Sequence, residues 1–223
     1  MGLRLVTRRQ RLSMKPNYLV HDEIYVQVKN AGLAGWGGNE RISHDSEFIE
    51  RVFAIEDVPS KGKLLELGCG EGHLSRCFAR LGYEVTGVDI SSAAVNWAKE
   101  KSKSLNIPGH FYVADLTKPA IDFLETYDVI VDGNCLHCII GDDRRTFLNL
   151  VFQSLLKNGV FFVSSLCSKD DHNAQIIKDG FAYRHISSVN NLISELEGIG
   201  FHILKTNIYE REKYNHITVH VKK

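Results

Sequence analysis

The chain has 223 residues, of which 43% are hydrophobic and 24% charged, and its formal net charge at pH 7 is zero. This average globular composition excludes fibrous and disordered proteins, and the balanced charge gives no overall attraction to nucleic acid or to an anionic membrane. The sequence shows neither an apolar run of the ~18 residues that span a bilayer nor the apolar core of a secretory signal. Five cysteines, an odd number, do not predict a disulfide framework. We expect a soluble, cytoplasmic protein.

The N-terminal part, residues 1–60, is predicted to be a helical extension or lid on one compact unit, residues 61–223. Its first stretch, Met1–Lys15, has five basic residues and no acidic one. This pattern fits either a solvated tail or a basic arm for nucleic acid or lipid. Apolar residues at helical spacing in Phe48–Phe53 predict a helix that ends before Pro59.

From Lys63 onward, short apolar runs alternate with longer amphipathic segments. The runs expected as strands are residues 63–67, 83–88, 110–114, 127–131 and 159–165, and the segments expected as helices are 71–81, 91–105, 117–126, 142–156 and 188–198. This alternation predicts a parallel sheet with right-handed crossovers. Two final strands, 201–210 and 214–221, are too close together for a crossover and must pair antiparallel. The predicted fold is α/β, a doubly wound, seven-stranded, mostly parallel sheet with a C-terminal antiparallel hairpin strand.

A glycine-rich loop follows the first predicted strand, with Gly68, Gly70 and Gly72 at alternate positions. Glycines let the backbone turn tightly and approach a ligand closely. A dinucleotide-binding loop would place its third glycine three positions after the second, but position 73 is a histidine. Glu66, at the end of the strand, would also repel a pyrophosphate. The loop therefore favours a ligand with a cationic group over NAD.

Carboxylates end the next two predicted strands. Asp89 stands at the tip of the second strand, where a carboxylate can accept both hydroxyls of a ribose; the alternative is a helix cap, which Ser91 or Ser92 could also provide. Asp115 ends the third strand and could accept from the exocyclic amine of adenine. Aspartates are common at such turns, so these signals gain weight only in combination.

In combination, four motifs occur in order: Glu66-Leu-Gly-Cys-Gly-Glu-Gly, Asp89, Ala114-Asp115 and Tyr127-Asp-Val-Ile-Val. Their order and spacing, from about Lys61 to the C-terminus, resemble the class I S-adenosylmethionine-dependent methyltransferases. The resemblance implies S-adenosyl-L-methionine as the cofactor and S-adenosyl-L-homocysteine as the product.

The resemblance also implies which residues contact the cofactor. The glycine loop would lie under the methionine moiety, Asp89 would bind the ribose hydroxyls and Ile90 would pack on the adenine. Asp115 and Leu116 would hold the adenine edge, and the residues after the fourth strand would line the methyl end. The full implied set is Glu66, Gly68, Cys69, Gly70, Gly72, Asp89, Ile90, Ala114, Asp115, Leu116, Asn134 and Cys135.

The segment after the fourth strand contains a C-x-x-C pair, Cys135 and Cys138, around His137. A zinc site would need two further ligands at suitable spacing, and a redox pair normally opens a helix in a thioredoxin-like setting. We expect no metal here and interpret the cysteines as small fillers near the cofactor. His137 is the candidate catalytic residue, as a general base or a substrate ligand; the alternative is a hydrogen-bonded structural histidine.

The acceptor is predicted to be a small molecule with an oxygen, nitrogen or sulfur nucleophile, because no basic face interleaved with aromatic residues favours nucleic acid. Candidate substrate contacts are Tyr25, Trp36, His137 and Tyr183. Trp36 could instead anchor the N-terminal helix in the core. Residues 166–187 are expected to be less regular, and the stretch Lys169–His185 within them is a candidate lid. Alternative hypotheses are a methyltransferase acting on protein or tRNA and a non-catalytic S-adenosylmethionine-binding module. The oligomeric state is left open.

Overall fold

The computed structural model describes residues 15–38, 45–119, 121 and 125–223. Its main sheet has seven strands in the order β3-β2-β1-β4-β5-β9-β8. The strands are β1 (Lys63–Leu67), β2 (Glu84–Asp89), β3 (His110–Val113), β4 (Tyr127–Asp132), β5 (Leu155–Cys167), β8 (His202–Tyr209) and β9 (Asn215–Lys222). The strands from β1 to β5 pair in parallel, whereas β9 pairs antiparallel with both β5 and β8. The predicted fold class is confirmed.

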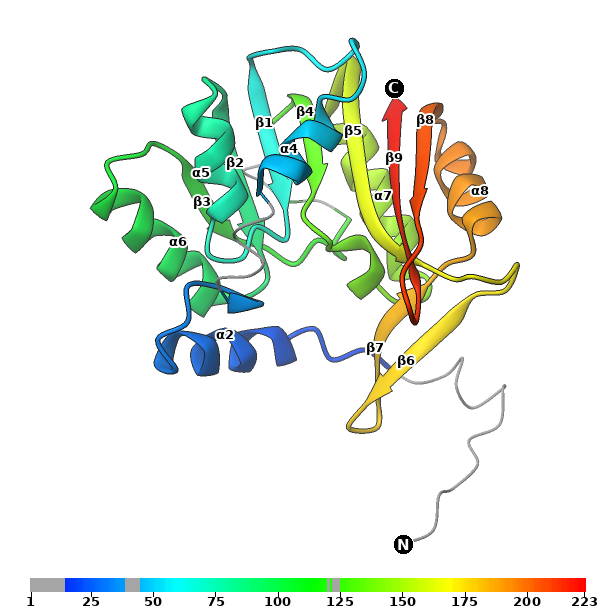
Figure 1. Cartoon of the computed structure of the whole chain (residues 1–223), viewed down its shortest axis with the longest axis horizontal. Helices are drawn as coiled ribbons and strands as arrows, with labels where there is room; N and C mark the ends of the chain where they lie inside the picture. The colour runs from blue at the N-terminus through cyan, green and yellow to red at the C-terminus, as the bar shows by residue number, and fades with distance from the viewer. Residues whose placement is uncertain (1–14, 39–44, 120, 122–124) are drawn as a thin grey trace, which may run out of the picture.

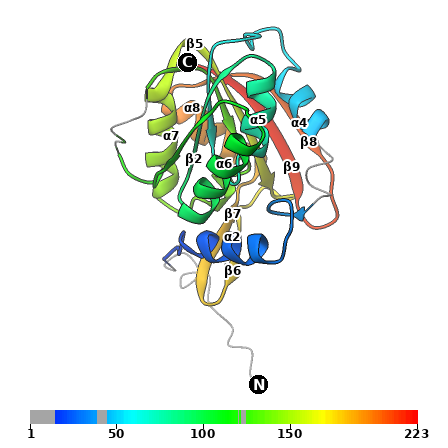
Figure 2. The same ribbon diagram turned by 90° about the vertical axis from the view of Figure 1, so that its left-hand side faces the viewer.

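Helices cover both faces of this sheet (Figures 1 and 2). The helices are α2 (Val20–Asn30), α4 (Asp45–Val52), α5 (His73–Arg80), α6 (Ser92–Ser104), α7 (Asp143–Ser154) and α8 (Val189–Ile199), with a 3-10 turn, η1 (Leu136–Cys138). Successive strand residues point to opposite faces. Leu64 of β1 therefore packs with Val52 of α4 and Phe78 of α5, and Leu65 packs in the core formed with α7 and α8.

Local signals set the ends of two crossover helices. Ser91 precedes α6 and accepts a hydrogen bond from the backbone N–H of Ala94 (3.0 Å). Ser188 caps α8 in the same way through Asn191 (3.2 Å), and Gly200, with φ of 114°, ends that helix. Serine N-caps satisfy N–H groups that have no partner within the helix, and a left-handed glycine closes the C-terminus.

The structure differs from the prediction in residues 166–187, which are irregular only in part. They contain a second, two-stranded antiparallel sheet of β6 (Ala174–Lys178) and β7 (Phe181–Ile186). The two-residue turn is Asp179-Gly180, with φ values of 48° and 82°. Asp-Gly is a strong hairpin signal because a type I′ turn needs positive φ at both positions.

Other differences are smaller. The fifth strand begins at Leu155, directly after α7, instead of at residue 159. The helix predicted over 117–126 is a turn and bend up to Pro119, and much of the remainder lies outside the described residues. Helix α2 has no counterpart among the individually predicted helices, and α4 is shorter than expected.

Helix α2 and the β6–β7 hairpin lie side by side beyond the carboxyl ends of the parallel strands (Figures 1 and 2). Asp22 of α2 accepts hydrogen bonds from the hydroxyl of Ser91 (2.8 Å) and the N–H of Ala93 (2.9 Å), which attaches α2 to the start of α6. A bridge between Pro16 and Ala182 attaches the chain before α2 to β7. Across residues 15–38, 45–119, 121 and 125–223, no helix has the length and apolarity to cross a membrane.

Candidate functional site

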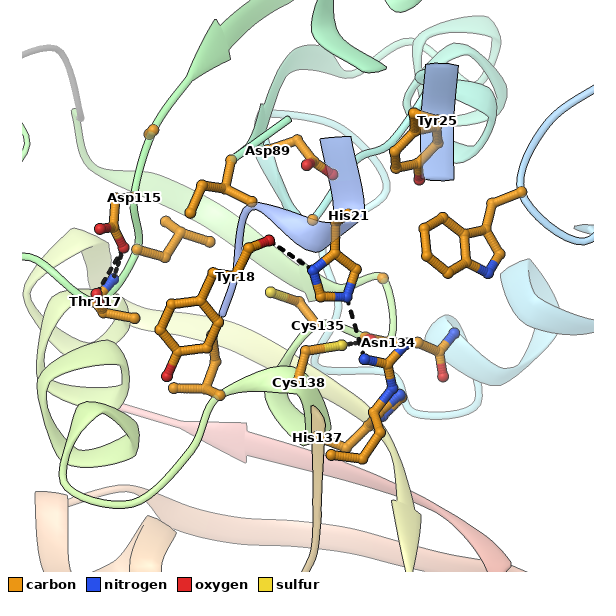
Figure 3. Close-up of a pocket in the computed structure, with 18 of the residues that line it drawn as sticks. Tyr18, His21, Tyr25, Asp89, Asp115, Thr117, Asn134, Cys135, His137 and Cys138 are labelled. Carbon is orange, nitrogen blue, oxygen red and sulfur yellow. Dashed lines mark hydrogen bonds between the residues drawn. The ribbon is translucent and has the colours of Figure 1, made fainter. Parts of the chain in front are cut away.

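Two adjoining cavities lie at the carboxyl ends of the parallel strands. The first has a volume of about 280 Å³ (Figure 3), and the second has about 400 Å³. Both are bordered by Gly68, Asn134 and Leu166 at the strand ends and by Tyr25 and Trp36 from the N-terminal extension. In open α/β sheets this edge is where ligands bind.

The glycine loop passes between the cavities in a left-handed backbone conformation, with φ of 67° at Gly68 and 55° at Gly70. A β-carbon on Gly70 would lie 2.2 Å from the hydroxyl oxygen of Tyr25, and one on Gly68 would lie 2.8 Å from the β-carbon of Cys135. Larger residues are excluded by both φ and space. Tyr25 thus lies directly over the loop.

Glu66, before that loop, is 2% exposed and accepts a hydrogen bond from the hydroxyl of Ser75. Glu66, Cys69 and Gly70 line the second cavity, whereas Gly72 lines neither. Gly72 instead precedes α5 with φ of 76°. The carboxyl group of Glu66 is therefore held at the strand end beside the loop, on the side of the second cavity.

Asp89 is held by its own surroundings at the tip of β2. Its two carboxylate oxygens accept the N–H groups of Gly70 and Ser91, each at 2.9 Å. Burial raises the pKa of Asp89, and these N–H groups partly offset that rise. A carboxylate offers about four acceptor positions, so Asp89 keeps acceptor capacity on the side that lines the first cavity.

An apolar slot continues from Asp89. Ile90, Ala114 and Leu116 line the first cavity beside it. Asp115 also lines this cavity, and its carboxylate accepts the N–H (3.0 Å) and hydroxyl (2.6 Å) of Thr117. Although burial raises the pKa of Asp115, the bonds from Thr117 and the charge of Lys118 lower it overall. Asp115 is therefore fixed in the charged state. The slot and its two flanking carboxylates fit an adenosine.

The turn after β4 is organised by Asp132, which the sequence analysis did not select. One carboxylate oxygen accepts the N–H groups of Cys135 (2.5 Å) and Leu136 (3.1 Å). The other oxygen has no hydrogen-bond partner among the described residues. Burial raises the pKa of Asp132 to about 7. Its position at the end of β4, matching Asp89 on β2, is the signal that could have identified it.

Asn134 follows in a left-handed conformation, with φ of 69°. Its side-chain oxygen lies 3.2 Å from the Ser164 hydroxyl and 3.1 Å from Nε2 of His216, so it accepts from both. Burial lowers the pKa of His216 to about 4. Asn134 is thereby fixed where the two cavities meet, beside Cys135.

His137 and Cys138 of η1, and Cys135 directly before it, line the first cavity. Nδ1 of His137 accepts the N–H of Leu166 at 3.4 Å, a contact that favours the tautomer with the proton on Nε2. Burial raises the pKa of Cys135 well above its usual range, so this thiol is protonated. The described residues contain no group of three or more His, Cys, Asp or Glu side chains that could hold a metal ion.

The remaining wall of the first cavity comes from α2 and the hairpin (Figure 3). Three residues that sequence reasoning missed, Tyr18, His21 and Arg184, lie there. Tyr183 borders neither cavity; it stacks on His21 with ring centroids 5.7 Å apart. Trp36 is half-buried and packs edge-on against Tyr25 at 5.1 Å. Trp36 therefore both lines the cavity and anchors α2.

The chain is similar to known proteins in sequence and in fold. Residues 59–217 match a family model described as a methyltransferase domain. The mitochondrial ubiquinone biosynthesis O-methyltransferase of Schizosaccharomyces pombe is 30% identical over 59% of the chain and 49% of that protein. An 18S rRNA (guanine-N(7))-methyltransferase of the same organism is 25% identical over 74% of the chain and 63% of that protein. The chain spans about half the length of the ubiquinone biosynthesis O-methyltransferases that it matches.

Among solved structures, the Burkholderia thailandensis 1,6-didemethyltoxoflavin-N1-methyltransferase superposes with a TM-score of 0.71. The match covers 100% of this chain and 93% of the other at 16% identity, so it supports the fold alone. The family match covers most of the chain, including the glycine loop and the three strand-end carboxylates. The chain therefore belongs to the class I S-adenosylmethionine-dependent methyltransferases, with S-adenosylmethionine as the cofactor of its site.

Proposed function

We propose that the chain transfers the methyl group of S-adenosylmethionine to an oxygen, nitrogen or sulfur nucleophile of a small molecule. The observation that carries this proposal is the first cavity. One side is lined by Asp89 and the apolar slot, and the other by Tyr18, His21, His137 and Arg184. A volume of about 280 Å³ shared between the two sides favours a small acceptor.

The chain's own residues would act mainly by positioning. When bound, S-adenosylmethionine supplies an activated methyl group on a sulfonium. Asp89 would hold the ribose hydroxyls, the glycine loop would hold the methionine end, and Asn134 would border the methyl end. Holding two reactants in the right geometry can supply most of the acceleration of such a transfer.

His137 is proposed to contact the acceptor. It borders the first cavity next to Cys138, and the tautomer favoured by Leu166 makes Nε2 a hydrogen-bond donor. His137 would act as a general base only in the opposite tautomer, which an acceptor with a hydroxyl group would require. Glutamine can donate a hydrogen bond but cannot act as a base. His137→Gln should therefore keep activity if His137 only positions the acceptor, and should lose it if His137 is the general base.

The N-terminal extension is proposed to act as a lid on this site. Tyr25 and Trp36 border both cavities, and α2 attaches to α6 through Asp22. Tyr25, Trp36 and His137 are the proposed substrate contacts. Tyr183 would contribute indirectly, by holding His21 and Arg184 in place.

The first test is calorimetric titration with S-adenosylmethionine, S-adenosylhomocysteine and, as a control, NAD. We expect micromolar binding of the first two ligands and none of NAD. Transfer of labelled methyl groups is then compared for a small-molecule filtrate, the RNA and the protein of a cell extract. We expect label in the filtrate. Cofactor binding without label in any fraction would favour the non-catalytic alternative.

Label in RNA or protein would favour a macromolecular acceptor, as the name of the 18S rRNA relative suggests for that protein. The basic stretch Met1–Lys15 lies outside the described residues except for Lys15. Its deletion gives an independent comparison: a macromolecular acceptor that docks on this stretch predicts loss of activity, and a small-molecule acceptor predicts little change.

A further inference from the structure

The β6–β7 hairpin brings an arginine to the wall of the first cavity that faces the cofactor residues. Arg184 lines this cavity with His21 and Cys138. Within the described residues, no Asp or Glu side chain forms an ion pair with Arg184. By contrast, the buried Arg144 of α7 forms a bidentate pair with Glu195. Among the residues that the structure describes, Arg184 is thus a cationic group of the site with no carboxylate partner.

Arg184 is held in place by neutral groups. Nη1 donates to the carbonyl of Tyr183 (3.0 Å) and to Nε2 of His21 (3.1 Å), and Nη2 donates to the Tyr183 hydroxyl (3.0 Å). The guanidinium carbon also lies 3.8 Å from the centre of the Tyr183 ring. A guanidinium has five N–H groups, so the Nε–H and one Nη2–H remain available. Those two donors are the pair that matches a carboxylate in bidentate geometry.

The surroundings keep the positive charge uncompensated. His21 donates from Nδ1 to the carbonyl of Tyr18 (2.8 Å) and accepts from Arg184 at Nε2, so its ring is neutral. Burial lowers the pKa of His21, and the charges of Arg184 and Lys178 lower it further. The ammonium of Lys178 lies 5.2 Å from the Tyr183 ring centre, which adds a second cation on the same hairpin.

Flat and apolar side chains also line this cavity. His21 and Trp36 lie at a centroid distance of 5.6 Å, and Ile139 and Leu166 are part of the same lining. Flat aromatic walls suit a planar ring that stacks on them. Glu66 and Gly70, which would hold the methionine end of the cofactor, line the second cavity, whereas Arg184 lines only the first. The methionine end and Arg184 would therefore lie in different places.

We propose that the methyl acceptor is a small aromatic or other planar carboxylate, with its carboxylate bound by Arg184 and its ring placed against the aromatic wall formed by His21 and Trp36. This inference rests on the proposed function and names the chemical class of its substrate.

The test compares acids with their uncharged amides: benzoate with benzamide, nicotinate with nicotinamide, and 3,4-dihydroxybenzoate with its amide. Each is titrated into full-length protein saturated with S-adenosylhomocysteine. For at least one pair we expect the acid to bind at least about tenfold more tightly, as one charge-assisted contact provides. Arg184→Gln should remove this preference and Arg184→Lys should keep part of it, while Arg145→Gln, an exposed arginine of α7, should keep it fully.

Three results would overturn the inference: no acid binds, acid and amide bind equally, or the preference survives in Arg184→Gln. S-adenosylhomocysteine affinity is measured first in every variant. If it falls in Arg184→Gln, the arginine serves the carboxylate of the cofactor and the inference is wrong. If S-adenosylhomocysteine does not bind to the unmodified protein, the proposed function itself fails.

Discussion

Each side of the first cavity is stabilised by its own hydrogen bonds, and the partners of these bonds are separated by different distances along the sequence. On the proposed cofactor side, Asp89 is fixed by N–H groups 19 and 2 residues away, and Asp115 by Thr117, 2 residues away. On the proposed acceptor side, Tyr18 donates to Asp143 across 125 positions, and His21 accepts from Arg184 across 163 positions. The first side is thus built by local turns and the second by the docking of distant segments.

This difference has a consequence for function. Turns that directly follow the strands fix the carboxylates of Asp89 and Asp115, although Asp22 and Tyr25 of α2 also contact this region. A wall assembled from side-chain contacts between distant segments can be altered by a few substitutions without disturbing the sheet. The fold can therefore retain one cofactor while the acceptor changes.

The largest expected effect concerns Asp132, at the boundary between the two sides. Its pKa is raised from 3.8 to about 7 in the folded protein. The stability contributed by the protonated form is complete below pH 4 and is lost as the pH rises through 7. Relative to Asp132→Asn, the unfolding free energy of the unmodified protein should fall by about 4 kcal/mol between pH 4 and pH 8. Urea denaturation at several pH values measures this difference.

The exposed Asp170 provides a matched control. Asp170→Asn should leave the pH dependence of the unfolding free energy as it is in the unmodified protein. If Asp132→Asn retains that same pH dependence, Asp132 is ionised in the folded state across this range and the assignment fails.

The second effect concerns Arg144, which joins the turn after β4 to the hairpin end and α8. Arg144 is 3% exposed, forms its bidentate pair with Glu195, and donates to the carbonyl of Leu136 (2.8 Å) and the hydroxyl of Ser187 (3.2 Å). Arg144→Met should lower the unfolding free energy by about 3 kcal/mol, because it leaves these acceptors buried or unpaired. Arg145→Met, on the exposed face, should change it by less than about 0.5 kcal/mol. Equal changes in the unfolding free energy of the two variants would show that the contacts of Arg144 contribute little to stability.

The third effect concerns Asp89 and tests the cofactor side directly. Asp89→Ala should weaken S-adenosylmethionine binding by about 2 kcal/mol, the value of two lost hydrogen bonds to a charged acceptor. Asp89→Asn, which keeps one acceptor oxygen, should lose less. Calorimetry measures both variants, with Asp170→Ala as the control. Unchanged affinity in Asp89→Ala would remove the ribose assignment.

The smallest effect concerns Tyr18, on the acceptor side. Its hydroxyl donates to Asp143 (2.8 Å) and accepts the N–H of Ile140 (3.1 Å). Tyr18→Phe should lower the unfolding free energy by about 1 kcal/mol and leave S-adenosylhomocysteine affinity unchanged, because the cofactor side is held separately. Tyr209→Phe removes a tyrosine hydroxyl from β8, at a residue that borders neither cavity, and serves as the control. A loss of S-adenosylhomocysteine affinity in Tyr18→Phe would contradict the separation of the two sides.

The sequence by itself determined the features that depend on neighbouring residues. The alternation of strands and helices predicts the sheet, because burial on both faces requires apolar strands and amphipathic crossovers. The glycine spacing, with Asp89 and Asp115 at the next two strand ends, predicts the adenosine side, because parallel strands bring their carboxyl ends to one edge. The Asp179-Gly180 turn was equally local, and its hairpin was within reach of sequence reasoning.

Only the tertiary structure decided which residues face the cofactor site from the other side. No periodicity relates Tyr18 and His21 to Arg184, since their contact arises from the docking of α2 and β7 over the sheet edge. The same holds for Asn134, whose partners Ser164 and His216 come from β5 and β9. Such contacts depend on where whole elements pack, and a single sequence contains no local record of that packing.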